Sequence, residues 1–82
     1  MTSPDIAPEA QLTSDLSGLN CPLPILRAKK ALADLPSGTV IKLICTDPGT
    51  PSDFEAFCRQ TGHALLKHER TESQFLFWIQ RR

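Results

Sequence analysis

The sequence predicts an α/β (α+β) two-layer sandwich in which two helices cover one face of a four-stranded mixed sheet. Segments with alternating apolar residues and segments with helical spacing follow one another in the order β-α-β-α-β-β. Right-handed crossovers between the strands place both helices on the same side of the sheet. With 82 residues, of which 40% are hydrophobic, the chain is long enough for one such domain and too short for a multidomain enzyme.

Residues 12–35 supply the first strand and the first helix. Leu12 and Leu16 alternate with polar residues, which predicts a short edge strand, although Ser14 weakens its apolar side. Gly18 permits a tight turn, and the apolar residues after it recur at helical spacing. The stripe expected to face the core consists of Ile25, Ala28, Leu32 and Leu35, and Pro36-Ser37-Gly38 ends the helix.

The next strand and helix follow at residues 39–62. Residues 39–46 are rich in β-branched and aliphatic side chains, which predicts a central strand. Thr50-Pro51-Ser52-Asp53 fits the S/T-x-x-D capping pattern with a proline at the first helical position, so a second helix is expected to begin there. Gly62 stands where a left-handed C-terminal cap is needed. The expected core-facing residues are Ile41, Leu43 and Cys45 of the strand and Phe54, Phe57, Cys58 and Thr61 of the helix.

The remaining chain forms two strand-like runs, residues 64–70 and 74–80, separated by a short polar turn. In the second run Phe75, Phe77 and Ile79 lie on one side of the strand. A terminal hairpin is therefore expected to complete the sheet.

Residues 1–10 are predicted to be a flexible leader because Pro4 and Pro8 stand among small and acidic residues without an apolar period. The folded domain is then expected to cover residues 11–82. No run approaches the roughly 20 apolar residues that a membrane span needs, and the N-terminus lacks the features of a signal peptide. We therefore expect a cytoplasmic protein with no membrane partner.

The composition also argues against several classes of function. Nine basic and nine acidic residues give a formal net charge of zero, which disfavours a protein whose main work is binding many phosphates. Residues 1–20 hold three acidic residues and no basic one, so the folded body is mildly basic. The three cysteines form no C-x-x-C pair and are accompanied by two histidines, so neither a disulfide framework nor a metal site is expected. No cofactor is predicted.

Cys21 stands immediately before a helix start that contains two prolines. If Cys21 is the N-cap, Pro22 and Pro24 supply no N–H group, and the sulfur accepts a hydrogen bond from Leu23 only. This bond and the helix dipole are expected to lower the pKa of the thiol and make the thiolate a nucleophile. The electrostatic argument is the same if Asn20 is the cap. The alternative is that Cys21 is a small buried residue at a helix start.

No candidate base lies beside Cys21, since His63 and His68 are distant in the sequence. A thiolate can attack a persulfide or a disulfide without a general base or an oxyanion hole. The expected chemistry is therefore transfer of sulfur between sulfur atoms rather than acyl hydrolysis.

The run Gly18-Leu19-Asn20-Cys21-Pro22-Leu23-Pro24, followed by Ala28-Lys29-Lys30-Ala31-Leu32, resembles the TusA (SirA-like) sulfur-carrier family, whose hallmark is a CPxP motif. The likeness extends over residues 12–82, through Asp47-Pro48, Asp53, Phe57-Cys58 and Gly62-His63. The chain departs from the family at Ser14, where an aliphatic residue is usual.

The resemblance implies a sulfurtransferase of βαβαββ fold that carries sulfane sulfur as a persulfide on Cys21. The donor would be a cysteine desulfurase or a rhodanese-type protein, and an acceptor protein would receive the sulfur. Relays of this kind serve tRNA thiolation, molybdenum-cofactor formation and sulfur oxidation. In this interpretation Pro22, Leu23 and Pro24 position the cysteine.

Arg27, Lys29 and Lys30 follow Cys21 on the first helix and could meet an acidic partner or an anionic persulfide, although a solvated helix face explains them equally well. Cys45 and Cys58 fall on apolar faces, and a core role is expected for both.

Two alternative functions stay open at this level. One is a small RNA-binding module that uses these basic residues with Arg81 and Arg82, although the zero net charge argues against direct nucleic-acid binding. The other is a thiol-redox regulator that pairs Cys21 with Cys58. Nothing in the sequence requires more than a monomer.

Overall fold

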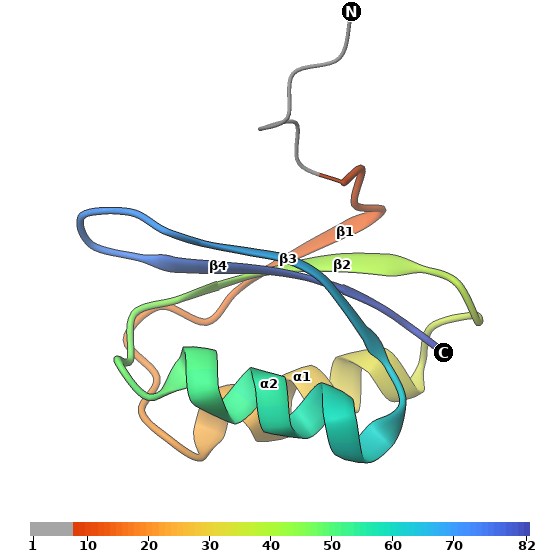
Figure 1. The fold of residues 1–82 in the computed structure, drawn as a ribbon, viewed down its shortest axis with the longest axis horizontal. Helices are drawn as coiled ribbons and strands as arrows, with labels where there is room; N and C mark the ends of the chain where they lie inside the picture. The colour runs from red at the N-terminus through yellow and green to blue at the C-terminus, as the bar shows by residue number, and fades with distance from the viewer. Residues whose placement is uncertain (1–7) are drawn as a thin grey trace, which may run out of the picture.

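The computed structural model describes residues 8–82, and the predicted leader falls largely outside these residues. Within this part, both helices lie on the same face of the sheet, and the opposite face carries no helix (Figure 1). This arrangement confirms the predicted two-layer sandwich and its order of elements. The strands and helices are β1 (Leu12–Asp15), α1 (Leu23–Ala33), β2 (Val40–Cys45), α2 (Thr50–Thr61), β3 (Ala64–Arg70) and β4 (Phe75–Gln80).

The four strands are arranged in the order β1-β2-β4-β3, so β1 and β3 form the edges. β1 runs parallel to β2 with Ser14 opposite Leu43, while β2 and β4 are antiparallel with Leu43 opposite Phe77. β3 and β4 form the terminal hairpin, with a register irregularity between Leu65 and Lys67. The predicted edge and central positions of β1 and β2 are confirmed. Because β1 and β2 are parallel, the loops into α1 and α2 both leave from the same end of the sheet, where the carboxyl ends of the two strands lie.

The core lies between the sheet and the two helices. Phe54 of α2 is fully buried, and its ring centroid lies 4.8 Å from Phe77 and 6.2 Å from Phe57. The period of two along the strands and of 3.6 along the helices brings the apolar side chains to this layer. Thr61, Ile25 and Leu35 are only partly buried. The buried cluster comprises Leu16, Ala28, Leu32, Ile41, Leu43, Cys45, Phe54, Phe57, Cys58, Phe77 and Ile79.

The outer face of the sheet also buries one large side chain. Trp78 is 3% exposed, because Lys42 and Lys67 lie over its ring with their ammonium groups 5.3 and 5.9 Å from the centroid. The aliphatic stems of lysines can cover apolar surface in this way while the charge stays in water.

The start of α2 differs from the sequence prediction. The N-cap is Gly49 rather than Thr50, and no side chain caps the helix. Asp47 instead forms the turn, since its carboxylate accepts the Gly49 N–H at 3.0 Å and its carbonyl accepts the buried Thr50 hydroxyl at 2.7 Å. At the other end of α2, Gly62 has φ of 85° and confirms the predicted left-handed cap.

In the described part of the chain, no helix is long and apolar enough to cross a membrane.

Candidate functional site

Cys21 is exposed and lies at the end of the sheet where β1 and β2 finish and both helices begin (Figure 1). The loop that carries it is tied to the neighbouring connection, because the Gly18 N–H donates to the Thr46 hydroxyl at 2.8 Å. Gly18 has φ of 83°, which a residue with a side chain rarely adopts, so the turn depends on this glycine. The parallel pairing of the two strands therefore brings Cys21 next to the start of α2.

The start of α1 corrects the prediction that Cys21 or Asn20 caps the helix. Pro22 is the N-cap, Leu23 is the first helical residue, and Cys21 lies outside the helix, with a cis peptide bond between Cys21 and Pro22. The Leu23 N–H donates to the Asn20 carbonyl at 2.8 Å. This backbone turn occupies the one donor that the sequence interpretation had assigned to the sulfur.

The pKa of the Cys21 thiol is raised above its ordinary value, which also contradicts the sequence prediction. The first cause is the hydrogen bond between the thiol and the Asp53 carboxylate, and partial desolvation and the negative charges of Asp53 and Asp47 act in the same direction. Both acidic residues come from the connection into α2 and its first turn. At rest, the structure therefore favours the thiol over the thiolate.

Asp53 is the residue of this site that the sequence interpretation missed, because it was assigned to helix capping. A signal was present in the sequence. The two predicted parallel strands finish at the same end of the sheet, so the acidic residues that follow the second strand come close to the cysteine that follows the first. The backbone of Asp53 is fixed beside this turn, because its N–H donates to the Gly49 carbonyl at 3.0 Å.

A cleft of about 210 Å³ lies beside the Cys21 sulfur. It lies at or below the lower end of the sizes usual for small-molecule sites. Leu23 and Leu26 in the first turn of α1 are 45% and 54% exposed, so they add adjacent apolar surface of the kind that can form part of a protein contact. The surroundings of the thiol therefore favour a macromolecular partner. The residues that line this cleft, called here the Cys21 cleft, are Cys21, Pro22, Ile25, Asp53, Ala56, Phe57 and Gln60.

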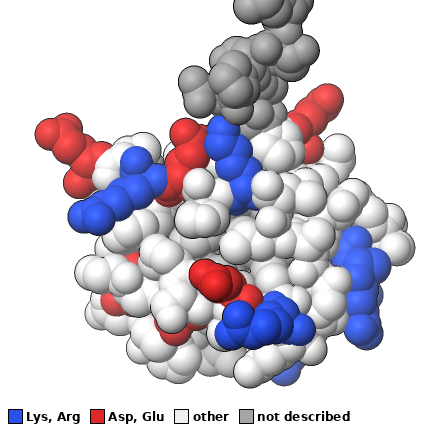
Figure 2. Space-filling model, in the orientation of Figure 1, with Lys and Arg blue, Asp and Glu red and all other residues white. Residues whose placement is uncertain are grey.

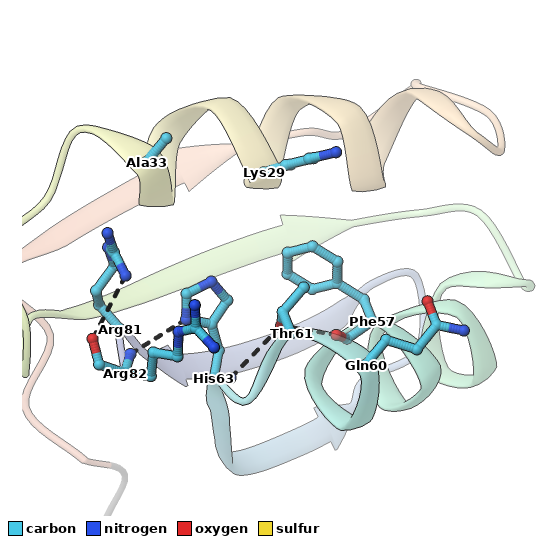
Figure 3. A pocket seen from close by; sticks show the side chains of 8 residues that line it. All are labelled: Lys29, Ala33, Phe57, Gln60, Thr61, His63, Arg81 and Arg82. Carbon is cyan, nitrogen blue, oxygen red and sulfur yellow. Dashed lines mark hydrogen bonds between the residues drawn. The ribbon is translucent and has the colours of Figure 1, made fainter.

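The other predicted site residues differ in burial and in their position relative to the clefts. Pro24 is buried beneath the turn, whereas Pro22 and Leu23 are exposed. Arg27, Lys29 and Lys30 are all exposed, and Lys29 lines a cleft between α1 and the end of α2 (Figure 3). This second cleft has a volume of about 340 Å³ and is called here the basic cleft. Its lining residues are Lys29, Ala33, Phe57, Gln60, Thr61, His63, Arg81 and Arg82.

The two other cysteines are in the core, as predicted. Cys45 is 0% exposed and Cys58 is 6% exposed. Burial raises the pKa of Cys58 to about 11, and burial, with the charges of Asp47 and Asp15, raises the pKa of Cys45 to about 12. Both thiols are therefore held in their unreactive form. The burial of Cys58 counts against a redox pair with the exposed Cys21.

Neither histidine lines the Cys21 cleft. His63 lies in the basic cleft, where its Nδ1 accepts the Arg82 N–H at 3.1 Å, and His68 stacks on Phe77 with centroids 6.5 Å apart. Among the residues that the structure describes, no group of three or more His, Cys, Asp or Glu could hold a metal ion.

Acidic and basic side chains are mixed over the face shown in Figure 2, with uncharged surface between them. A nucleic-acid-binding face would be expected to collect basic residues in one stripe.

Comparison with known proteins decides the family. The family described as Sulfurtransferase TusA matches residues 13–81 of this chain. The chain belongs to this family. A relative from Neisseria meningitidis serogroup A is 56% identical over 68 residues, which cover 83% of this chain and 92% of the relative. The sulfur carrier protein TusA of Allochromatium vinosum is 52% identical over 67 residues, 82% of this chain and 88% of that protein.

The crystal structure of a SirA-like protein from Desulfitobacterium hafniense shares the fold of this TusA family member. Its TM-score is 0.74 at 27% identity, over 84% of this chain and 95% of that chain. Family membership gives the protein a general role in sulfur transfer, and the motif Cys21-Pro22-Leu23-Pro24 lies within the matched residues.

Proposed function

We propose that this protein is a sulfur carrier that accepts sulfane sulfur as a persulfide on Cys21 and passes it to an acceptor protein. The observation that carries the proposal is the contrast between its thiols: Cys21 is exposed on a proline-flanked surface turn, while Cys45 and Cys58 are buried. Membership of the TusA family supports sulfur transfer as the chemistry of this thiol.

The transfer step is an exchange between sulfur atoms. The Cys21 thiolate attacks the outer sulfur of a persulfide on the donor protein, a new S–S bond forms on Cys21, and the donor S–S bond breaks. The donor cysteine leaves as a thiolate and takes up the proton that Cys21 lost, so no external oxidant or reductant is needed. In this formal sense the protein acts as a sulfurtransferase.

The exposed thiol and the small cleft beside it favour protein donors over a free small molecule. We propose a cysteine desulfurase or a rhodanese-type protein as the donor, and an acceptor that serves tRNA thiolation, molybdenum-cofactor formation or sulfur oxidation. Three unpaired thiols are typical of a reducing compartment, and we propose the cytoplasm.

The test is an intact-mass measurement after incubation of the reduced protein with a cysteine desulfurase and cysteine. We expect a gain of one sulfur atom that a reductant reverses and that Cys21→Ser abolishes. Cys45→Ala and Cys58→Ala are the controls, because alanine avoids burying a hydroxyl group without a partner, and both should still load. Loading that survives Cys21→Ser, or no loading from desulfurases and a rhodanese alike, would overturn the proposal.

A further inference from the structure

We propose that the groove between α1 and α2, which runs from Cys21 to the basic cleft, binds an extended acidic segment of the partner protein. This inference rests on the proposed function, since it assigns the surface on which a sulfur donor or acceptor docks. It also fixes the orientation of that segment relative to Cys21.

The Cys21 cleft and the basic cleft adjoin each other, because Phe57 and Gln60 of α2 line both, and the two together are called here the groove. The opposite wall is α1, where Ile25 lines the first cleft and Lys29 lines the second. These two α1 residues are four positions apart and so lie on one face of the helix. The groove therefore follows the helix pair rather than crossing it.

The basic cleft presents three cationic side chains and no acidic side chain among its lining residues (Figure 3). The Arg81 charge is partly matched within the cleft, because its Nη1 donates to the terminal oxygen of Arg82 at 3.4 Å, so the positive excess comes from Lys29 and the Arg82 guanidinium. Lys29 comes from α1, while Arg81 and Arg82 follow β4. Arg81 is held in place because its Nε donates to the Leu35 carbonyl at 3.2 Å. Burial and the two neighbouring arginines lower the pKa of His63, and its Nδ1 accepts the Arg82 N–H at 3.1 Å, so this site favours the neutral imidazole. An anionic group is therefore the complementary occupant of this end.

The Cys21 end has the opposite sign. Asp53 lines the cleft beside the sulfur, and Asp47 is close enough to act on the same thiol. A nucleic-acid strand carries a negative charge at every phosphate, so its backbone would be repelled at this end of the groove. A polypeptide can be acidic at one end and neutral or basic at the other, and for this reason the charge pattern favours a protein segment.

The length of the groove sets the spacing within that segment. From Leu23 to Lys29, α1 advances about 9 Å at about 1.5 Å per residue. An extended chain advances about 3.3 Å per residue, so an acidic side chain roughly three or four positions from the partner cysteine reaches the basic cleft while the two sulfur atoms meet. An acidic residue adjacent to that cysteine would instead face Asp53.

The test uses synthetic peptides with one cysteine activated as a mixed disulfide with thionitrobenzoate. The Cys21 thiolate attacks the peptide sulfur, a Cys21–peptide disulfide forms, and the coloured thionitrobenzoate leaves, so its release gives the rate. Two peptides carry a pair of glutamates three and four positions before or after the cysteine. A third carries glutamate next to the cysteine, and each peptide has a glutamine counterpart.

At low salt we expect at least one of the two spaced acidic peptides to react about three- to tenfold faster than its glutamine counterpart, with the difference lost at high salt. The peptide with an adjacent glutamate should react more slowly than its counterpart. Lys29→Gln together with Arg82→Gln should remove the rate advantage. Lys30→Gln is the matched control, because Lys30 is an exposed cation on the same helix that lines neither cleft, and it should keep the advantage.

The proposal is overturned if neither spaced peptide reacts faster than its counterpart, or if Lys30→Gln removes the advantage and the double variant keeps it. The peptide reaction requires only an accessible Cys21 thiol, whereas the loading assay measures sulfur transfer. Normal loading without a charge preference would therefore refute the groove alone, and a charge preference without loading would refute the carrier function alone.

Discussion

In the native protein at neutral pH, we expect iodoacetamide to alkylate Cys21 and to leave Cys45 and Cys58 unmodified. The reason is the burial of the two core thiols, which raises the pKa of Cys58 to about 11 and that of Cys45 to about 12. The reagent reacts with the thiolate, so the thiolate fraction sets an upper limit on each rate.

The size of the effect follows from these pKa values. In the unfolded chain a cysteine has a pKa of about 8.5, so roughly a tenth of it is thiolate near pH 7.5. At the same pH the folded-state thiolate fractions are on the order of 3 × 10⁻⁴ for Cys58 and 3 × 10⁻⁵ for Cys45. Alkylation of the native protein should therefore be slower than that of the urea-unfolded protein by about 300-fold at Cys58 and about 3,000-fold at Cys45.

Time-resolved intact-mass spectrometry with peptide mapping measures all three sites at once. The native protein should gain one label, the unfolded protein three, and native Cys21→Ser none on the same timescale. A second label that appears on the native protein as fast as the first would refute the reasoning, because it would place a core thiol within reach of the reagent.

Three further perturbations test the site and the fold. Asp53→Asn removes the carboxylate that bonds to the Cys21 thiol, so the pKa of Cys21 should fall and its alkylation profile should move to lower pH; an unchanged profile would contradict the assigned contact. The folded-state pKa values of Cys45 and Cys58 lie above the unfolded value, so their stabilising contribution is complete below about pH 8.5 and is lost as the pH rises toward 11 and 12. Urea unfolding should then show a loss of about 3 kcal/mol between pH 8.5 and 10, about half of which disappears in Cys58→Ala, and a flat profile in the wild type would refute this linkage. Gly62→Ala places a side chain at φ of 85° and should lower the free energy of unfolding by about 1–2 kcal/mol, whereas unchanged stability in the same assay would argue against the left-handed cap.

The fold was predictable because local patterns and the topology rules agree. The alternation of Ile41 and Leu43, the helical spacing of Ala28 and Leu32, and the position of Gly62 each depend on residues close in sequence. The structure confirms each of these predictions. The four apolar side chains are buried, and α2 ends at a residue in the left-handed conformation.

The helix starts were less predictable, because several donors and acceptors compete there within a few residues. Thr50 fits a capping pattern, yet its hydroxyl donates back to the Asp47 carbonyl, and Gly49 becomes the cap. At α1 the Leu23 N–H is satisfied by the Asn20 carbonyl. In both cases a backbone turn supplies the contact that the sequence pattern had assigned to a side chain.

By itself, the sequence determined the order of elements and the core cysteines, and it predicted the turn at Cys21-Pro22-Leu23-Pro24 as the place of the proposed chemistry. Only the tertiary structure decided the electrostatics of that turn, because Asp53 lies 32 positions after Cys21 and reaches it through the parallel pairing of β1 and β2. Which basic residues line a cleft was likewise decided by packing, since Lys29 lines the basic cleft, whereas its neighbour Lys30 lines neither this cleft nor the Cys21 cleft. Local chemistry follows from spacing along the chain, whereas the sign of the charge around a thiol depends on what distant segments place beside it.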